Sequence, residues 1–360
     1  MSTAALFDRT LRTLDGVRLS SFRMALRSGP LSAWVVRRER RLVLTTALHA
    51  GVAAVLAVTF PVLLFVLAPV LLGVAHVAAD VRYLVLRRKL TRSWRAAIVT
   101  ACLVLFGCQL LTLTRVWRVP ERAELGVVVV WAFAAVAAAA GSARVRRRVV
   151  LGFGLVLLVG AAALAWPHAF RQLFLHAHNL IALALWPSFF RRRPRALLLL
   201  RAPIVALALL LATGVGHRIT LASPGVHVFG LHALDLAAWL SPFARADLAL
   251  GITSAFVFLQ AVHYSIWLNV IPQAEQPGEG TLSFRQSARA LTADFGRSGL
   301  VIVIVAALAV LLLATAHPVE ASTSYVALAL FHGYLELVLW LYFWIRGTRI
   351  RESIPRSRVS

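Results

Sequence analysis

The stretch PVLLFVLAPVLLGVAHVAADVRYLVLRRKLTRSWR, residues 61–95, indicates how the whole chain is built. Most of it, up to Leu86, is apolar, whereas its last nine residues, 87–95, carry five basic side chains. A helix needs about 20 mostly apolar residues to cross a hydrocarbon core about 30 Å thick. The stretch therefore predicts a membrane-spanning helix over 62–86, with a kink at Pro69, that ends in a basic loop.

The composition of the whole chain agrees with this interpretation. The 360 residues are 60% hydrophobic and only 14% charged, whereas a soluble domain is about 45–50% apolar and about 25% charged. The net charge of +24 comes almost entirely from arginines, which occur in short clusters between apolar runs. This pattern is typical of topology signals beside anionic lipid headgroups, so we expect the lipid bilayer as a partner and no nucleic acid.

Repeated apolar runs predict an all-α, polytopic integral membrane bundle with about ten transmembrane helices. Basic loops follow every second run, which places the N- and C-termini in the cytoplasm by the positive-inside rule, and the cell inner membrane is the expected location. The predicted spans lie near residues 42–60, 62–86, 95–114, 124–142, 147–166, 168–190, 196–214, 248–271, 298–316 and 321–345.

Three regions are expected along the chain: an N-terminal arm (1–40), the transmembrane bundle (41–346) and a basic cytoplasmic tail (347–360). The arm alternates apolar and arginine residues, which is compatible with an amphipathic helix on the inner leaflet or with disorder. Within the bundle we expect an outer connection at 215–247, with a short interfacial or re-entrant helix in it, and a cytoplasmic loop at 272–297.

Histidines from five predicted spans share one layer of the membrane. At about 1.5 Å of rise per residue they lie roughly 12–20 Å from the cytoplasmic boundary. Asp80 and Glu336 each follow one of them by four residues, which puts each pair on one helix face. Ionisable groups at such depth normally face a bundle interior and mark a site or pathway. The histidines of the layer are His49, His76, His176, His178, His263 and His332.

Four of these histidines, His76, His178, His263 and His332, are the predicted metal ligands. Neutral imidazole is the commonest protein ligand for iron, copper and zinc, and four imidazoles without thiolates suit iron or copper in a redox role, with non-haem iron as the suspected cofactor. Ligating histidines usually donate their other N–H group to a carboxylate or another acceptor. Supporting positions around the ion are therefore predicted for Asp80, Glu336, His176, Asn179 and His49.

The spacing of two neighbouring histidines leaves open which of them faces the ion. His176 and His178 are two residues apart, about 200° around a helix, so only one of them can face the ion directly.

Tyr264 and Tyr334 are the candidate catalytic residues, because their hydroxyls lie at the depth of the histidines and could orient a substrate. Cys102 and Cys108 fall on different faces of one helix and are expected to pack rather than form a disulfide.

The segment LLGVAHVAADVRYLVLRR, residues 71–88, resembles a stretch of the bacterial membrane-bound β-carotene oxygenases, the bacteriorhodopsin-related-protein-like (Brp/Blh-like) family. Gly73, His76 and Asp80 reproduce the family's spacing of glycine, histidine and aspartate. The resemblance implies an all-helical membrane enzyme that cleaves β-carotene to retinal with O₂ at one iron held by four histidines. His178, His263 and His332 would complete that set by analogy of depth. The family's closely spaced histidine pairs are absent here.

The sequence leaves several functions open. The first is an iron-dependent oxygenase acting on a hydrophobic isoprenoid or lipid, such as a carotenoid. The same histidines and carboxylates are compatible with a transporter or proton-coupled permease, with a haem b protein, or with a scaffold that does no chemistry. Nucleotide-binding glycine motifs, a G-x-S-x-G elbow and an H-E-x-x-H zinc motif are all missing from the sequence. The oligomeric state is not predicted.

Overall fold

The computed structural model describes residues 3–27, 29, 32–141, 145–189, 198–275, 280 and 283–348. Nearly all of these residues are helical, which confirms the all-α prediction. The only strands in the described ranges are β1 (His227–Val228) and β2 (Leu231–His232), which form one short antiparallel hairpin. Most of the predicted tail lies outside the described residues.

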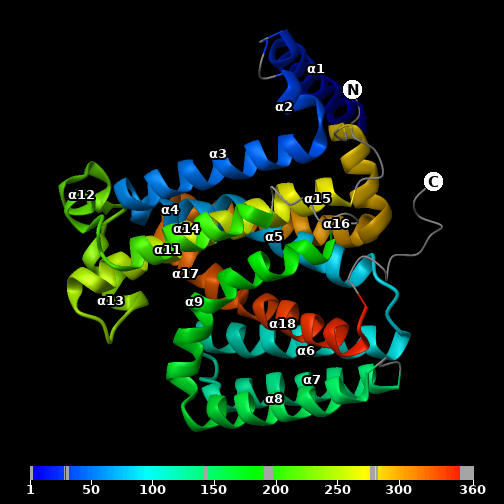
Figure 1. Cartoon of the computed structure of the whole chain (residues 1–360), viewed down its shortest axis with the longest axis vertical. Coiled ribbons are helices and arrows are strands. Elements are labelled where there is room, and N and C mark those ends of the chain that lie inside the picture. Colours follow the sequence, from blue (N-terminus) through cyan, green and yellow to red (C-terminus); the bar gives the residue numbers. More distant parts are fainter. Residues whose placement is uncertain are drawn as a thin grey trace.

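Most helices in the first half of the chain run back and forth across the longest axis of the molecule (Figure 1). Its second span is not one regular helix but two α-helical pieces joined and followed by wider π-helical turns. The elements are α1 (Thr3–Arg27), α2 (Ser32–Val36), α3 (Arg38–Thr59), α4 (Pro61–Ala68), η2 (Pro69–Gly73), α5 (Val74–Asp80), η3 (Val81–Leu86), α6 (Arg92–Leu113), α7 (Glu121–Ala140) and α8 (Arg146–Ala165).

The second half adds the helices that complete the bundle and the small elements at one end of it. They are α9 (Pro167–Leu185), η4 (Trp186–Phe189), α11 (Arg201–Ala212), α12 (His217–Ala222), η5 (Pro224–Val226), α13 (Ala233–Leu240), α14 (Ala246–Ser265), η6 (Ile266–Val270), α15 (Ile271–Ala274), α16 (Phe284–Ala316), α17 (Pro318–Leu328) and α18 (Leu330–Arg346).

Among the described residues, eight continuous helical segments are long and apolar enough to cross a membrane. The chain is thus a multi-pass membrane protein by length and composition. Two of the ten predicted spans fall short of that standard. The span predicted at 168–190 forms α9, in which Arg171, three histidines and Asn179 lower the hydropathy. The span predicted at 196–214 appears as α11, which is only 12 residues long.

Prolines set several of the helix boundaries. Pro61, Pro167 and Pro318 each begin a helix, where a missing N–H group costs nothing and the fixed φ angle suits the first turn. Pro69, the predicted kink, begins the π-helical turn η2 in the middle of a span. A proline there removes a backbone donor, so the helix rearranges locally rather than continuing as a regular α-helix.

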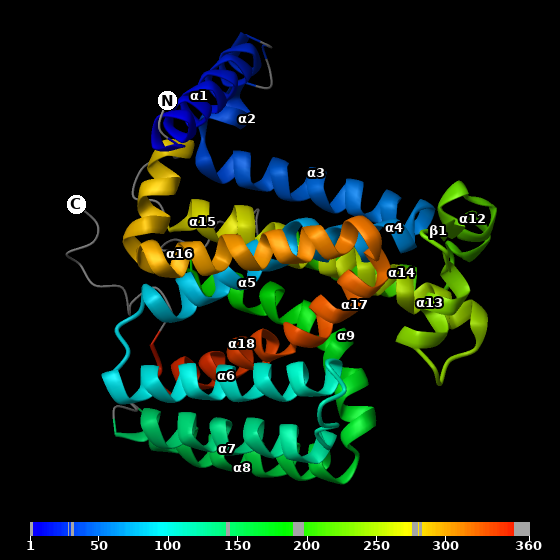
Figure 2. The ribbon, with the colours of Figure 1, turned by 180° about the vertical axis from the view of Figure 1, so that it is seen from behind.

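α14 lies at the centre of the bundle and α16 on its outside. Most of the apolar window of the segment Ala246–Ala274 is buried, 83% of it, whereas none of the corresponding window of α16 is. Figure 2 shows α16 along one face of the molecule, crossing in front of α5 and α14. α16 carries exposed apolar side chains such as Val301, Ile302 and Leu312. Exposing these apolar side chains to water would be unfavourable, whereas a helix face that contacts lipid is expected to carry them.

The outer connection is more structured than predicted. Instead of the one short helix predicted within this connection, the chain forms the β1–β2 hairpin and then α13, from Ala233. The cause is the turn at Phe229 and Gly230, which both have positive φ angles, 55° and 75°. Two consecutive residues of that kind favour a tight hairpin turn, so the apolar run is divided.

The predicted N-terminal arm forms α1, which packs against the start of α16. The carboxylate of Asp15 accepts a hydrogen bond from the backbone N–H of Phe284 at 2.7 Å, which satisfies a free donor in the first turn of α16. Asp8 also lies 3.1 Å from Arg285. The contact of α1 with a lipid leaflet stays a prediction.

Helices α11 and α14 approach each other closely at two glycines. A methyl group on Gly251 would lie 2.5 Å from the backbone nitrogen of Gly214 and 2.8 Å from the carbonyl oxygen of Leu211. Small residues at such crossings let the backbones of membrane helices touch. Backbone atoms cannot move aside as a side-chain tip can, so the larger residue would push the helices apart.

We therefore expect Gly251→Ala to lower the free energy of unfolding by about 1–3 kcal/mol, the usual cost of overpacking. Thermal unfolding of the detergent-purified protein measures it. Gly154→Ala on α8 is the matched control, because nothing lies within 4 Å of the added methyl group. Equal unfolding temperatures for the two variants would show that the close contact of α11 and α14 is not formed.

Candidate metal centre

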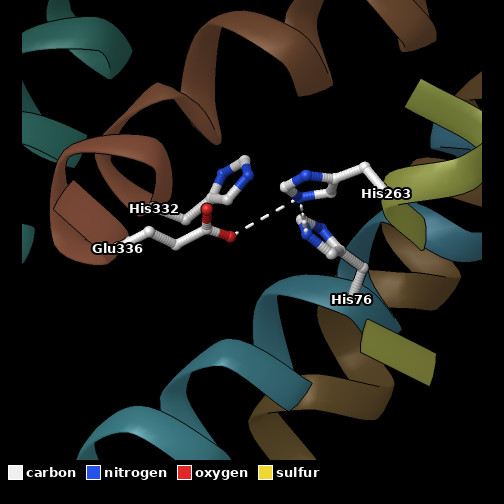
Figure 3. A group of neighbouring side chains, drawn as sticks. All are labelled: His76, His263, His332 and Glu336. Atoms are coloured by element: carbon white, nitrogen blue, oxygen red, sulfur yellow. Dashed lines mark hydrogen bonds and ion pairs between the residues drawn. The ribbon is translucent and has the colours of Figure 1, made fainter. Parts of the chain in front are cut away.

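Three segments that are distant in sequence bring four buried side chains together in the bundle (Figure 3). His76 comes from α5, His263 from the end of α14, and His332 and Glu336 from α18. One ligand atom from each of the four lies within 4.8 Å of the other three. The predicted convergence of His76, His263 and His332 is therefore a feature of the structure.

Irregular helix geometry lies next to two of these histidines. α5 has a π-helical turn on either side of it, η2 and η3, and α14 passes into the π-helical turn η6, which begins three residues after His263. A π-turn inserts an extra residue and rotates the side chains that follow, and such turns are frequent at functional sites. The turn η2 therefore sets the rotation of His76, whereas η6 changes the helix only beyond His263.

A break between α17 and α18 positions the third histidine. The chain leaves the regular helix at Ala329, and the carbonyl of Ala329 accepts hydrogen bonds from both the backbone N–H and the ring Nδ1–H of His332. Because Nδ1 carries the proton in this arrangement, the neutral ring keeps a free lone pair on Nε2. That atom points to the other ligands and can bind an ion.

The nitrogen atoms at the centre are unusually close together. Nε2 of His76 lies 2.7 Å from Nε2 of His263, and Nε2 of His178 lies 3.2 Å from Nε2 of His332. The ring centroids of His76 and His332 are 4.7 Å apart, and those of His178 and His263 are 4.9 Å apart. All four predicted histidine ligands therefore meet in one group.

Two carboxylates complete the group. An oxygen of Asp80 lies 3.5 Å from Nε2 of His76, and an oxygen of Glu336 lies 3.5 Å from Nε2 of His263. Both carboxylates are fully buried. Within the described ranges, neither has an arginine, a lysine or an N-terminus within ion-pair distance. A buried carboxylate is costly without a compensating positive charge.

These observations fit a divalent metal ion. Nitrogen and oxygen ligands held about 2.1 Å from one ion lie roughly 3 Å from their neighbours, and the distances above run from 2.7 to 3.5 Å. Four neutral imidazoles and two carboxylates around one such ion would carry no net charge, which suits an apolar interior.

Glu336 lies closer to the centre than its predicted supporting position implies. The most compact set of ligand atoms contains Glu336 with His76, His263 and His332, whereas His178 stands beside it through its contact with His332. Asp80 keeps a supporting position next to His76. The spacing of four residues places Glu336 on the same helix face as His332, but it does not show that the carboxylate extends to the other ligand atoms.

Three other predicted residues do not join the centre. Nε2 of His176 lies 3.0 Å from the carbonyl oxygen of Leu240, on the opposite side of α9, so His178 is the residue of the pair that faces the site. His49 pairs with Ser265 at 2.6 Å, between α3 and α14. Tyr334 is two residues from His332 and therefore on the other face of α18, where its ring stacks on Phe174 at 4.4 Å.

The remaining predictions lie close to the centre. The ring of Tyr264 is 4.8 Å from that of His76, and Asn179 lines a small pocket beside His178 and His332. Sequence reasoning missed Tyr325, which lines the same pocket. Its spacing of seven residues from His332 gave no usable signal, because the chain leaves the regular helix at Ala329, between the two residues.

The fold and this centre together define a class of protein: a multi-pass helical membrane protein with a histidine and carboxylate cluster buried inside the bundle. No protein-family model, curated protein or solved structure matches the chain.

Proposed function

We propose that the chain is a metal-dependent membrane oxidoreductase, with non-haem iron as the ion, that acts on a hydrophobic isoprenoid or lipid substrate. The observation that carries the proposal is the compact set of His76, His263, His332 and Glu336, with His178 next to it. A histidine-rich set without thiolates suits a redox-active ion, and iron supplies activation of O₂ when bound.

The chain's own residues would hold the ion and keep water away from it. His76 and His263 supply nitrogens from one side of the centre, and His332 and Glu336 from α18 supply the other. Asp80, next to His76, would balance charge and fix the orientation of that ring. The surrounding apolar helices exclude bulk water, which limits competing reactions of the substrate.

A second, apolar cavity lies apart from the metal centre and does not by itself bring a substrate to the ion. It has a volume of about 240 Å³, lies between α7, α8 and α18, and is lined almost wholly by apolar side chains, with Tyr334 at its wall. This space admits a hydrocarbon segment. It lies on the face of α18 opposite His332 and Glu336, so Tyr334 would contact the hydrocarbon and not the ion.

Two alternatives are supported less well by this geometry. A permease relay needs polar groups at successive depths across the bilayer, whereas the histidines gather at one point. A haem b protein needs room for a porphyrin between its two histidine ligands, but here the Nε2 atoms lie only 2.7 Å apart in His76 and His263 and 3.2 Å apart in His178 and His332.

The resemblance at Gly73, His76 and Asp80 suggests the reaction to test: cleavage of one carbon–carbon double bond of a carotenoid by O₂. Both oxygen atoms would enter the products, one in each of two new carbonyl groups, so no external reductant is needed. The full-length protein, purified in detergent, is expected to contain about one iron per chain and to yield aldehyde products from β-carotene in air.

The reaction under argon is the control, and it should give no product. A folded protein that retains no metal after mild purification would refute the proposal as a whole. A protein that binds one iron but leaves β-carotene intact would refute only the carotenoid as substrate, and other isoprenoid lipids would then be tested with O₂ uptake as the readout.

A further inference from the structure

A small pocket lies directly beside the metal centre, between α9, α14, α17 and α18. His178 and His332 form the wall on the side of the centre. Asn179, Gln260 and Tyr325 contribute polar side chains to the rest of the lining. The pocket measures about 20 Å³, which is enough for a water-sized molecule and far too small for a hydrocarbon ring.

The polar groups around this pocket are buried but not satisfied. Asn179 is 1% exposed, and neither its amide nitrogen nor its amide oxygen has a hydrogen-bond partner in the described part of the chain. Gln260, 5% exposed, uses its nitrogen for a long contact of 3.5 Å to the hydroxyl of Tyr264, while its oxygen has no partner. Such groups are rare in folded proteins and normally indicate a bound water or ligand.

The phenol of Tyr325 is held against the pocket by a glycine. A methyl group on Gly73 would overlap the ring of Tyr325, so only glycine at position 73 leaves space for that ring. The hydroxyl of Tyr325 is buried and has no hydrogen-bond partner in the described part of the chain. Gly73 lies one helical turn before His76, and so the same turn that supplies a metal ligand also admits Tyr325.

We propose that this pocket binds a small neutral oxygen-containing ligand next to the metal, a water molecule at rest and O₂ during the reaction, held by Asn179, Gln260 and Tyr325. The proposal rests on the proposed function and adds to it a separate place for the oxygen reactant. A hydrocarbon substrate could not form hydrogen bonds with these polar groups. The pocket's size fits one or two oxygen atoms, and its amide and phenol groups fit the resting water molecule. Free O₂ is a weak hydrogen-bond acceptor, so the N–H and O–H donors hold it as it gains negative charge during the reaction.

The first test is a high-resolution structure of the full-length protein in lipid nanodiscs. We expect a non-protein density peak in the pocket, within hydrogen-bond distance of Asn179 and of Gln260 or Tyr325. The peak should disappear in Asn179→Leu, which has a similar volume and no polar atoms. An empty pocket, or one filled by lipid chain density, would overturn the proposal whether or not the protein contains metal.

The second test separates a reactant site from a site for structural water. Nitric oxide, a neutral diatomic stand-in for O₂, is titrated into the anaerobic ferrous protein and followed by its optical spectrum. Losing one hydrogen bond in a buried site lowers the affinity for the bound molecule about tenfold. Asn179→Leu and Gln260→Leu should therefore each raise the dissociation constant for nitric oxide roughly tenfold. Gly73→Ala, which displaces Tyr325 and leaves every polar group in the chain, should weaken binding as well.

Ser254→Ala on α14 is the matched control. Ser254 is buried, but its hydroxyl donates to the carbonyl of Leu250 in its own helix and does not line the pocket. Unchanged nitric oxide affinity in the two leucine variants, with full iron content, would show that the pocket holds structural water only and would overturn the assignment to O₂. Loss of iron in the unmodified protein would instead count against the proposed function.

Discussion

Replacing His263 by alanine is expected to remove the metal from the purified protein almost completely. Nε2 of His263 lies 2.7 Å from Nε2 of His76 and 3.5 Å from an oxygen of Glu336, so it is central to the cluster. Losing one of about four ligands from a compact site weakens metal binding by orders of magnitude, because replacing even groups outside the ligand set lowers the metal affinity 10- to 100-fold. Metal content per chain, measured by mass spectrometry, gives the result.

The matched control for this experiment comes from the other histidine-rich helix. His176 and His178 are two residues apart on α9, but only His178 contacts the cluster, whereas His176 faces the carbonyl of Leu240. We expect His178→Ala to lower the metal content and His176→Ala to leave it unchanged. Equal loss in both variants would mean that the effect is general destabilisation of α9 rather than loss of a ligand.

Replacing Glu275 by glutamine is expected to destabilise the fold by about 3–5 kcal/mol, the typical cost of breaking a buried ion pair. Glu275 follows α15 and lies 3.0 Å from the guanidinium of Arg88, and both side chains are buried. Burial lowers the pKa of Arg88, and the Glu275 carboxylate opposes that change. The guanidinium of Arg88 also lies over the ring of Phe189 at 5.1 Å.

The substitution removes the carboxylate charge and keeps the side chain's size, so a large loss can be attributed to the charge. Thermal unfolding in detergent is the measurement. Asp247→Asn serves as the comparison, because Asp247 pairs with Arg245 at the surface, 3.7 Å away with both side chains exposed, and such pairs contribute about 0–1 kcal/mol. If Glu275→Gln unfolds at the same temperature as the unmodified chain, the pair of Arg88 and Glu275 is not a stabilising contact between α15 and the end of the second span.

The candidate site was predictable in part, and helix rotation is the first source of error. The depth of His76, His263 and His332 follows from counting residues along a helix, which is a local property, and these three do converge. Which side of a helix faces the centre depends on its rotation, which neighbouring helices determine. For this reason the spacing of Tyr334 and His176 could not show that α18 and α9 turn these residues away.

Irregular backbone geometry adds a second source of error. The π-helical turns around α5 and after α14 shift the helical phase, and the break at Ala329 changes the direction of the chain before His332. Regular-helix arithmetic therefore could not give the contacts of Glu336 or place Tyr325 against Gly73. Proline and glycine in the sequence indicated that breaks exist, but not how the helices rotate across them.

By itself the sequence determined that the chain is an all-α, multi-pass membrane protein and predicted that six of its histidines share one layer, because hydropathy and helical rise are properties of consecutive residues. Only the tertiary structure decided that Glu336 joins three of those histidines, that His178 and not His176 faces them, and that a polar pocket lies beside them. These features depend on how distant helices pack and rotate against each other, and that packing is not encoded in any single segment.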